Sequence, residues 1–99
     1  MPAYIITTRK GPVRDPEAMA EYQRRTRAMG RNPSLTPLVV YGATEVLEGE
    51  APDGTVIMQF PSVEDARAWY NLPEYQAAIP YRQKAADYDM YIVEGLESV

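Results

Sequence analysis

The sequence contains neither cysteine nor histidine. Without cysteine the chain cannot form disulfides, use a thiolate nucleophile or bind zinc through sulfur. Without histidine it lacks imidazole metal ligands, the Ser-His-Asp arrangement and the side chain that most readily titrates near neutral pH. No glycine-rich phosphate-binding loop is present either. We therefore expect no metal site, no bound cofactor and no nucleotide hydrolysis.

Long apolar runs and an excess of basic residues are also missing. No segment reaches the length of a transmembrane helix, and Met1–Lys10 lacks the apolar core of a signal peptide. The net charge is -4, whereas a protein that binds phosphate backbones needs a clustered basic surface. Arg24 and Arg25 follow Glu21 at helical spacings, which is typical of an ion-paired helix face. The sequence predicts a cytoplasmic protein that binds neither membranes nor nucleic acids.

A chain of 99 residues has room for one hydrophobic core, so residues 1–99 are expected to form a single domain. Domains of this size bury enough surface to fold, but with a thin margin of stability. An interface with a second copy would add to that margin. We therefore expect a homodimer.

The first half of the chain begins with an expected strand over Ala3–Thr8, which is rich in Ile, Thr and Tyr. Asp15 is placed to cap a helix whose first residue is Pro16. The helix should end near Gly30, because residues 31–37 contain two prolines, an asparagine and a serine. The pattern predicts a strand, a helix and a loop in this order.

A long strand with a bend at Gly42 should follow this loop. Leu38–Tyr41 is rich in β-branched and aromatic residues, and Thr44–Leu47 resumes the alternation. A turn over Ala51–Gly54 then leads back into the strand Thr55–Phe60. These segments predict a hairpin.

A helix in two pieces is expected after the hairpin. Ser62 supplies an N-cap oxygen for the first piece. Pro73 ends that piece, because it disfavours helical geometry in the residue before it, and it can itself occupy the first turn of a second helix. Asp89–Val93 is the last expected strand.

The order strand, helix, strand, strand, broken helix, strand predicts an α+β protein with the ferredoxin-like β-α-β-β-α-β plan and an antiparallel sheet. Helices cover only one face of such a sheet. Both faces of the expected strands nevertheless carry apolar residues, as Ile5 with Ile6 and Ile57 with Met58 show. The second face is therefore expected to pack against another copy, which would form a dimeric α+β barrel.

Aromatic residues and one arginine are the strongest candidates for a binding site. Tyrosine and tryptophan offer an apolar ring with a polar tip, although such residues also serve in cores and interfaces. Arg82 falls on the apolar stripe of the second helical piece, where a guanidinium needs an anion: a substrate carboxylate or enolate, or a side chain such as Glu45 or Asp87. The predicted pocket, between the helices and the sheet, is lined by Tyr22, Tyr41, Trp69, Tyr75 and Arg82.

Several segments resemble the DUF1330 family of small bacterial proteins, and the likeness extends over nearly the whole chain. It is carried by Asp15–Ala18, Glu45–Gly49, Phe60–Ala66, Pro73–Gln76 and Tyr91–Gly95. The resemblance implies a dimeric α+β barrel, but no activity, because the family has no assigned general function. Members often carry a His-Gly-Gly-Arg-type turn after the first helix. This chain has Met29–Pro37 there, which predicts a remodelled pocket edge without a role for histidine.

The residues available for catalysis are tyrosines, carboxylates, Arg82 and backbone amides. They suit proton transfer next to a carbonyl, as in isomerisation, cyclisation or decarboxylation of a small aromatic or carbonyl acid. The same homodimer could instead be a non-catalytic module that binds a metabolite or serves dimerisation alone. The sequence predicts a small organic ligand and leaves open whether the protein is an enzyme.

Overall fold

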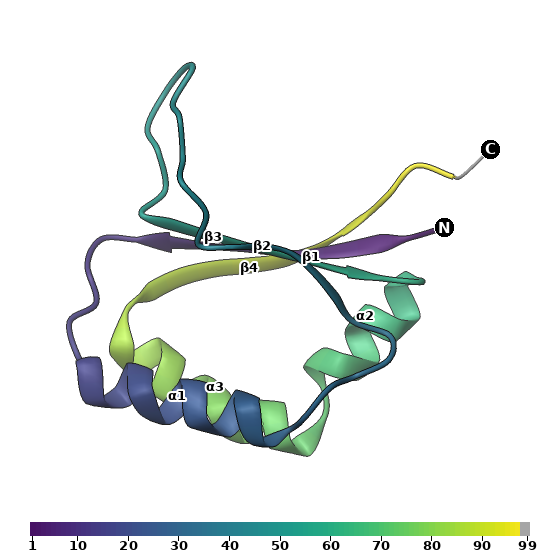
Figure 1. Cartoon of the computed structure of the whole chain (residues 1–99), viewed down its shortest axis with the longest axis horizontal. Coiled ribbons are helices and arrows are strands. Elements are labelled where there is room, and N and C mark those ends of the chain that lie inside the picture. The colour runs from purple at the N-terminus through teal and green to yellow at the C-terminus, as the bar shows by residue number, and fades with distance from the viewer. Residues whose placement is uncertain (98–99) are drawn as a thin grey trace.

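The computed structural model describes residues 1–97 and places a four-stranded antiparallel sheet over a layer of helices (Figure 1). In chain order the elements are β1 (Ala3–Lys10), α1 (Pro16–Ala28), β2 (Thr36–Val40), β3 (Gly54–Phe60), α2 (Val63–Tyr70), α3 (Pro73–Ala85) and β4 (Asp87–Glu94). The spatial order of the strands is β2-β3-β1-β4. This is the predicted ferredoxin-like arrangement, with α2 and α3 as the two pieces of the broken helix.

The helices begin where their capping residues predict. Asp15 accepts a hydrogen bond at 3.0 Å from a backbone N–H three residues on, and α1 begins at Pro16. Ser62 accepts the equivalent bond at 3.1 Å for α2. Pro73 is the first residue of α3, because the extended backbone of Leu72 separates the two helices. These predictions from local sequence are confirmed.

The helices fill the covered face of the sheet unevenly. α2 packs against β1, β3 and β4, whereas α1 and α3 pack side by side in a layer that lies farther from the strands (Figure 1). The buried core therefore gathers at the α2 end. It consists of Ala3, Ile5, Phe60, Ala66, Trp69, Tyr75 and Ile79. No helix in the described part of the chain is both long and apolar enough to cross a membrane.

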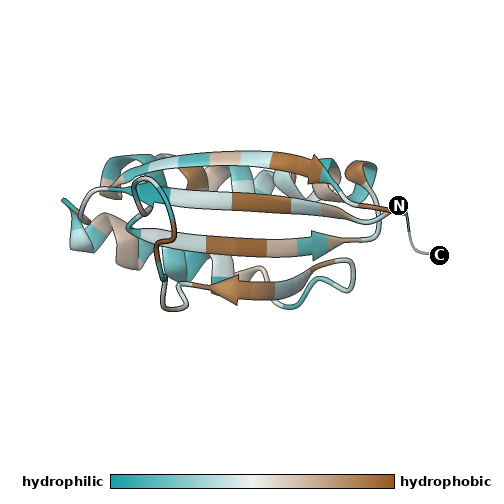
Figure 2. Ribbon diagram, turned by 90° about the horizontal axis from the view of Figure 1, so that it is seen from above, coloured by the Kyte–Doolittle hydropathy of each residue, from teal (hydrophilic) through white to brown (hydrophobic). Residues whose placement is uncertain are grey.

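The opposite face of the sheet has no helix over it in the described structure (Figure 2). Ile5 is buried on the helix side, so Ile6 points to this uncovered face. Ile6 is paired with Ile57 of β3 and with Tyr91 of β4, and Ile57 is paired with Val39 of β2. These four residues form an apolar row that crosses all four strands.

The strand predicted over Thr44–Leu47 is wrong. β2 ends at Val40, and residues 41–53 form an exposed arm that projects beyond the uncovered side of the sheet (Figure 1). Alternation suits a strand, but a strand also needs a neighbour to pair with, and β3 begins only at Gly54. The irregularity of pairing lies inside β2 rather than at Gly42.

Candidate functional site

A buried arginine is the most unusual feature of the covered face. Ala78, Ile79 and Ala85 are buried along one side of α3, and Arg82 lies on the same side at helical spacing. Its side chain faces the sheet, with the guanidinium carbon 5.6 Å from the ring centroid of Tyr88 in β4. Arg82 is only 6% exposed, so a permanent positive charge sits inside the fold.

Arg82 has no acidic partner among the described residues. Of the two candidate carboxylates, Asp87 pairs with Arg14 at 2.9 Å, and Glu45 lies on the exposed arm. The Nε atom of Arg82 is buried and donates no hydrogen bond. Burying a charge is costly unless it is paired. The buried Nε–H of Arg82 therefore lacks the acceptor that would offset this cost.

Arg82 lines a cavity of about 330 Å³ between the helices and the sheet, here called the Arg82 chamber. Thr7 of β1 lines the same chamber from the sheet side. It is 4% exposed, and its hydroxyl also lacks a hydrogen-bond partner. Apolar side chains such as Val56, Met58 and Met90 make up much of the remaining wall. Two unpartnered polar groups therefore meet in one apolar cavity, which suits a ligand with a polar head.

A cluster of aromatic rings supports one wall of the chamber. Trp69 stacks on Tyr75 with the ring centroids 4.2 Å apart, and the Tyr22 and Tyr75 hydroxyls share a hydrogen bond of 2.9 Å. Tyr22 and Trp69 line the chamber, whereas Tyr75 is completely buried. Tyr75 thus positions the two rings that line the chamber.

A second tyrosine pair links the two edges of the sheet. The hydroxyls of Tyr41, which follows β2, and Tyr88 of β4 are 2.8 Å apart, although β3 and β1 lie between these strands. Tyr41 has a φ of 55°, a costly conformation for a bulky residue. Its ring lies so close to Gly54 that a Cβ there would be 2.7 Å away. Both tyrosines line the Arg82 chamber, so their bridge forms part of its wall.

The chamber is electropositive. Its charged lining residues are Arg82 and Arg27, and none of its described lining residues is a carboxylate. Burial raises the pKa of Tyr22 and of Tyr41 well above the ordinary tyrosine value, and burial also raises the pKa of Tyr75. These hydroxyls are therefore protonated at neutral pH and can donate hydrogen bonds. Nowhere in residues 1–97 do three acidic side chains gather as a metal site requires.

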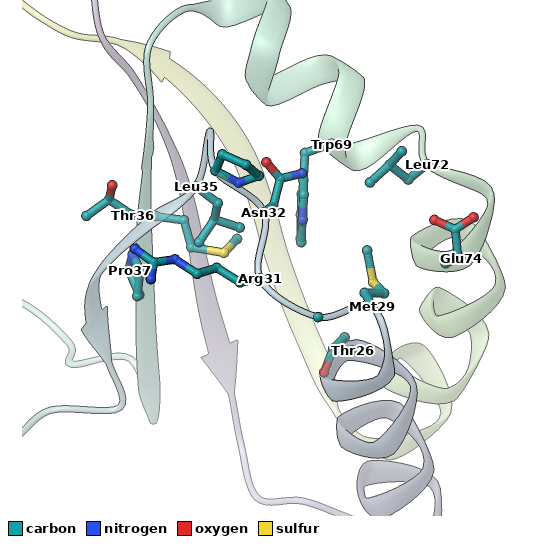
Figure 3. Close-up of a pocket in the computed structure, with 13 residues that line it drawn as sticks. Thr26, Met29, Arg31, Asn32, Leu35, Thr36, Pro37, Trp69, Leu72 and Glu74 are labelled. Carbon is teal, nitrogen blue, oxygen red and sulfur yellow. The ribbon is translucent and has the colours of Figure 1, made fainter.

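A larger cavity of about 670 Å³ adjoins the first, under the loop that follows α1, and is here called the loop chamber (Figure 3). Leu35 of that loop and Leu72, between α2 and α3, belong to its wall. Three residues line both chambers: Thr26, Met58 and Trp69. The loop expected to remodel a pocket edge thus borders a cavity.

The predicted site residues lie together. Four of the five line the Arg82 chamber: Tyr22, Tyr41, Trp69 and Arg82. Tyr75 does not line it, but Tyr75 packs against Trp69 and shares a hydrogen bond with Tyr22. Thr7 and Tyr88 also line the chamber but were not among the five predicted residues. Thr7 could have been found, because it is a polar residue in the alternating buried series of β1. The sequence marks Tyr88 only as one of several aromatic residues that could line a pocket, because its contact with the other edge of the sheet depends on the tertiary structure.

Residues 2–96 match a family described as "Domain of unknown function (DUF1330)". The chain belongs to the DUF1330 family. Among curated proteins, none matches the sequence. The family assignment gives this DUF1330 protein a set of relatives but no activity.

Solved structures share the fold of this DUF1330 chain. A protein of unknown function from Rhodopseudomonas palustris is 21% identical, with 98% of this chain and 84% of that chain covered and a TM-score of 0.64. A dimeric ferredoxin-like protein of unknown function from Thermobifida fusca YX is 16% identical, with coverages of 94% and 90% and a TM-score of 0.64. An ethyl tert-butyl ether d (EthD) family protein from Bacillus halodurans C-125 is 16% identical, with coverages of 97% and 100% and a TM-score of 0.62. At these identities the likeness concerns the fold alone.

Proposed function

We propose that the Arg82 chamber binds a small organic acid whose carboxylate accepts hydrogen bonds from Arg82. The observation that carries this proposal is the buried guanidinium without an acidic partner among residues 1–97. The planar fork of N–H donors in arginine matches a carboxylate in geometry and charge. A ligand carboxylate would supply the acceptor that the described side chains do not.

The rest of the ligand is expected to be apolar or aromatic. A volume of about 330 Å³ lies at the lower end of the range of small-molecule sites, roughly 300–1,000 Å³. Trp69 and Tyr22 present ring surfaces to this space, and Val56 and Met90 add aliphatic surface. Phenylacetate, a carboxylate on a single aromatic ring, is a suitable probe.

Non-catalytic binding is favoured over proton transfer. An enzyme that removes a proton next to a carbonyl needs a base within reach of the reacting carbon. The described wall of the Arg82 chamber contains no carboxylate, and burial keeps the hydroxyls of Tyr22 and Tyr41 protonated. The proposed role is therefore a binding module that sequesters or senses a small acid.

Phenylacetate and its neutral amide, phenylacetamide, separate recognition of charge from burial of the ring. Isothermal titration calorimetry should show binding of the acid and at least roughly tenfold weaker binding of the amide. Arg82→Met should weaken phenylacetate binding roughly tenfold to a hundredfold, as expected for loss of a charged hydrogen bond. Arg24→Met removes an exposed arginine that pairs with Glu21 and should bind like the wild type.

Equal affinity for acid and amide, or unchanged affinity in Arg82→Met, would contradict the proposed site. Catalysis has a separate test. If the protein exchanged the α-protons of phenylacetate for deuterium in D₂O, as followed by NMR, a base would act in the chamber. That result would favour the enzyme hypothesis over a binding module.

We also infer that a second copy of the chain covers the apolar row. The row spans the sheet face that no described helix covers, and its member Tyr91 is 49% exposed. The ferredoxin-like proteins from Thermobifida fusca and Bacteroides fragilis, which share the fold, are described as dimeric. Exposed apolar surface of this kind marks interaction sites.

Analytical ultracentrifugation tests this inference. The wild type should sediment as two chains, and Ile57→Glu, which places a charge in the middle of the apolar row, should sediment as one. Ala68→Glu adds the same charge at an exposed position on α2 and should remain a dimer. A wild-type mass of one chain would contradict the homodimer.

A further inference from the structure

The Arg82 chamber and the loop chamber meet at a shared wall. Thr26 of α1, Met58 of β3 and Trp69 of α2 line both cavities. Figure 3 shows Trp69 standing between the loop that carries Leu35 and the segment that carries Leu72. The same three side chains therefore border both spaces.

Methionines are concentrated around these two spaces. Every methionine except Met1 lines at least one of them: Met19 and Met90 the Arg82 chamber, Met29 the loop chamber and Met58 both. An unbranched thioether rearranges more readily than other apolar side chains, which suits surfaces that adapt to a ligand. The shared wall is therefore adaptable at Met58.

The two chambers differ in where their polar groups lie. In the Arg82 chamber the two polar atoms without partners, Nε of Arg82 and the hydroxyl oxygen of Thr7, are buried, whereas its second arginine, Arg27, is exposed. In the loop chamber the charged residues are Arg31 and Glu74, and both are exposed. Apolar side chains lie between these two polar ends. A ligand that occupied both spaces would have its charged group at the inner end and an apolar tail toward the loop.

We propose that the ligand is an elongated monocarboxylate, with its carboxylate at Arg82 and its apolar tail passing Met58 and Trp69 into the loop chamber. This inference rests on the proposed function, because it takes the place of the carboxylate from it. It adds that the ligand is elongated, because a cavity of about 670 Å³ lies beyond the shared wall. Short acids would fill the inner chamber alone.

A series of phenylalkanoates tests the length of the ligand. Phenylacetate, 4-phenylbutyrate and 6-phenylhexanoate carry the same charge and ring and differ only in the number of methylenes. Calorimetry on the wild-type protein should show affinity rising about fourfold for each added methylene, the gain expected when a methylene is buried. Arg82→Met should weaken the binding of every member of the series.

Variants that fill the loop chamber test whether longer acids gain affinity from this chamber or only from their greater hydrophobicity. Leu35→Trp should bind phenylacetate with the affinity of the wild type, but its affinity should no longer rise with the length of the acid. Leu47→Trp adds the same ring to the exposed arm and should keep the gain. If Leu35→Trp does not fold, Leu72→Phe narrows the chamber from another wall and should also reduce the gain.

The outcomes distinguish this inference from the proposed function. If phenylacetate binds and depends on Arg82 but longer acids bind no more tightly, the elongated ligand is wrong and the proposed function stands. A gain with length that persists in both filled variants would also overturn the inference. If no member of the series binds, the proposed function fails, and this inference fails with it.

Discussion

The two ends of the covered sheet face differ in how they are filled, although β1 runs through both. At the α2 end, Ala3 and Ile5 are 0% and 1% exposed and pack with Phe60. Toward the other end, Thr7 lies on the same face of the same strand but borders the Arg82 chamber. The reason is the helix layer: α2 lies directly on the strands, whereas the paired helices α1 and α3 lie farther from them (Figure 1).

This comparison assigns stability and the proposed ligand binding to different ends of the same sheet face. The α2 end, here called the packed end, should supply most of the free energy of folding, because protein interiors are close-packed. The end at the Arg82 chamber, here called the hollow end, contains the buried charge of Arg82, whose Nε atom has no partner among residues 1–97. Such an arrangement costs stability and is retained where function needs it. Removal of a packed side chain at one end and removal of the Arg82 charge at the other should therefore change the free energy of unfolding in opposite directions.

The largest expected effect is at the packed end. Phe60→Ala should lower the free energy of unfolding by about 3–5 kcal/mol, because it removes a ring that is 1% exposed and packs against Trp69. Urea unfolding at a fixed protein concentration measures this change. A loss below about 1 kcal/mol would mean that this end is not the packed core.

Arg82→Met should have the opposite sign. Replacing a buried charge that has no partner in the described structure by an apolar side chain of similar length should raise the free energy of unfolding by about 1–4 kcal/mol in the absence of ligand. Arg24→Met, at an exposed position, should change it by less than about 0.5 kcal/mol. A clear loss of stability in Arg82→Met would mean that the guanidinium holds the fold together.

Alkaline pH should lower the free energy of unfolding through the buried tyrosines Tyr22 and Tyr75. Burial raises the pKa of Tyr22 and Tyr75, so the unfolded chain loses these protons near pH 10 while the folded chain retains them. The free energy of unfolding is unaffected below this pH. Above it, stability should fall by about 1.4 kcal/mol per pH unit through Tyr22, and Tyr75 should add to this loss. Urea unfolding between pH 9 and 11 should show this slope, and an equal slope in Tyr22→Phe would contradict the assignment.

The smallest expected effect concerns the tyrosine bridge in the wall of the hollow end. Tyr41→Phe removes one hydroxyl of the 2.8 Å pair and should cost about 1 kcal/mol. Tyr88→Phe removes the other. If the hydroxyls interact, the double variant should lose less than the sum of the two single losses, as a double-mutant cycle measures. Additive losses would show that the bridge contributes nothing in solution.

Local residue patterns were sufficient to predict most of the fold. The caps at Asp15 and Ser62 and the break at Pro73 act on their nearest neighbours in the chain, so the sequence alone determines where these helices begin. Helical spacing also placed Arg82 on the buried side of α3. Much of the candidate site could be named in advance for this reason.

Interactions between distant segments could not be predicted in the same way. Thr44–Leu47 alternates like a strand, yet it lies on the exposed arm because no neighbouring strand pairs with it in the described structure. Asp87, one of the candidate partners for Arg82, pairs instead with Arg14 near the start of α1. Strand pairing and ion pairing depend on which segments meet in space.

The sequence by itself determined the order of the elements, the two-piece helix and the place of an arginine on the apolar stripe of a helix, because each depends on residues a few positions apart. Only the tertiary structure decided that α1 and α3 lie farther from the sheet than α2 does (Figure 1). That placement leaves a cavity beside the Arg82 Nε atom and the Thr7 hydroxyl, neither of which has a hydrogen-bond partner in the described structure. The physical reason is that a hollow space is a property of how whole elements pack, and no local pattern of residues encodes it.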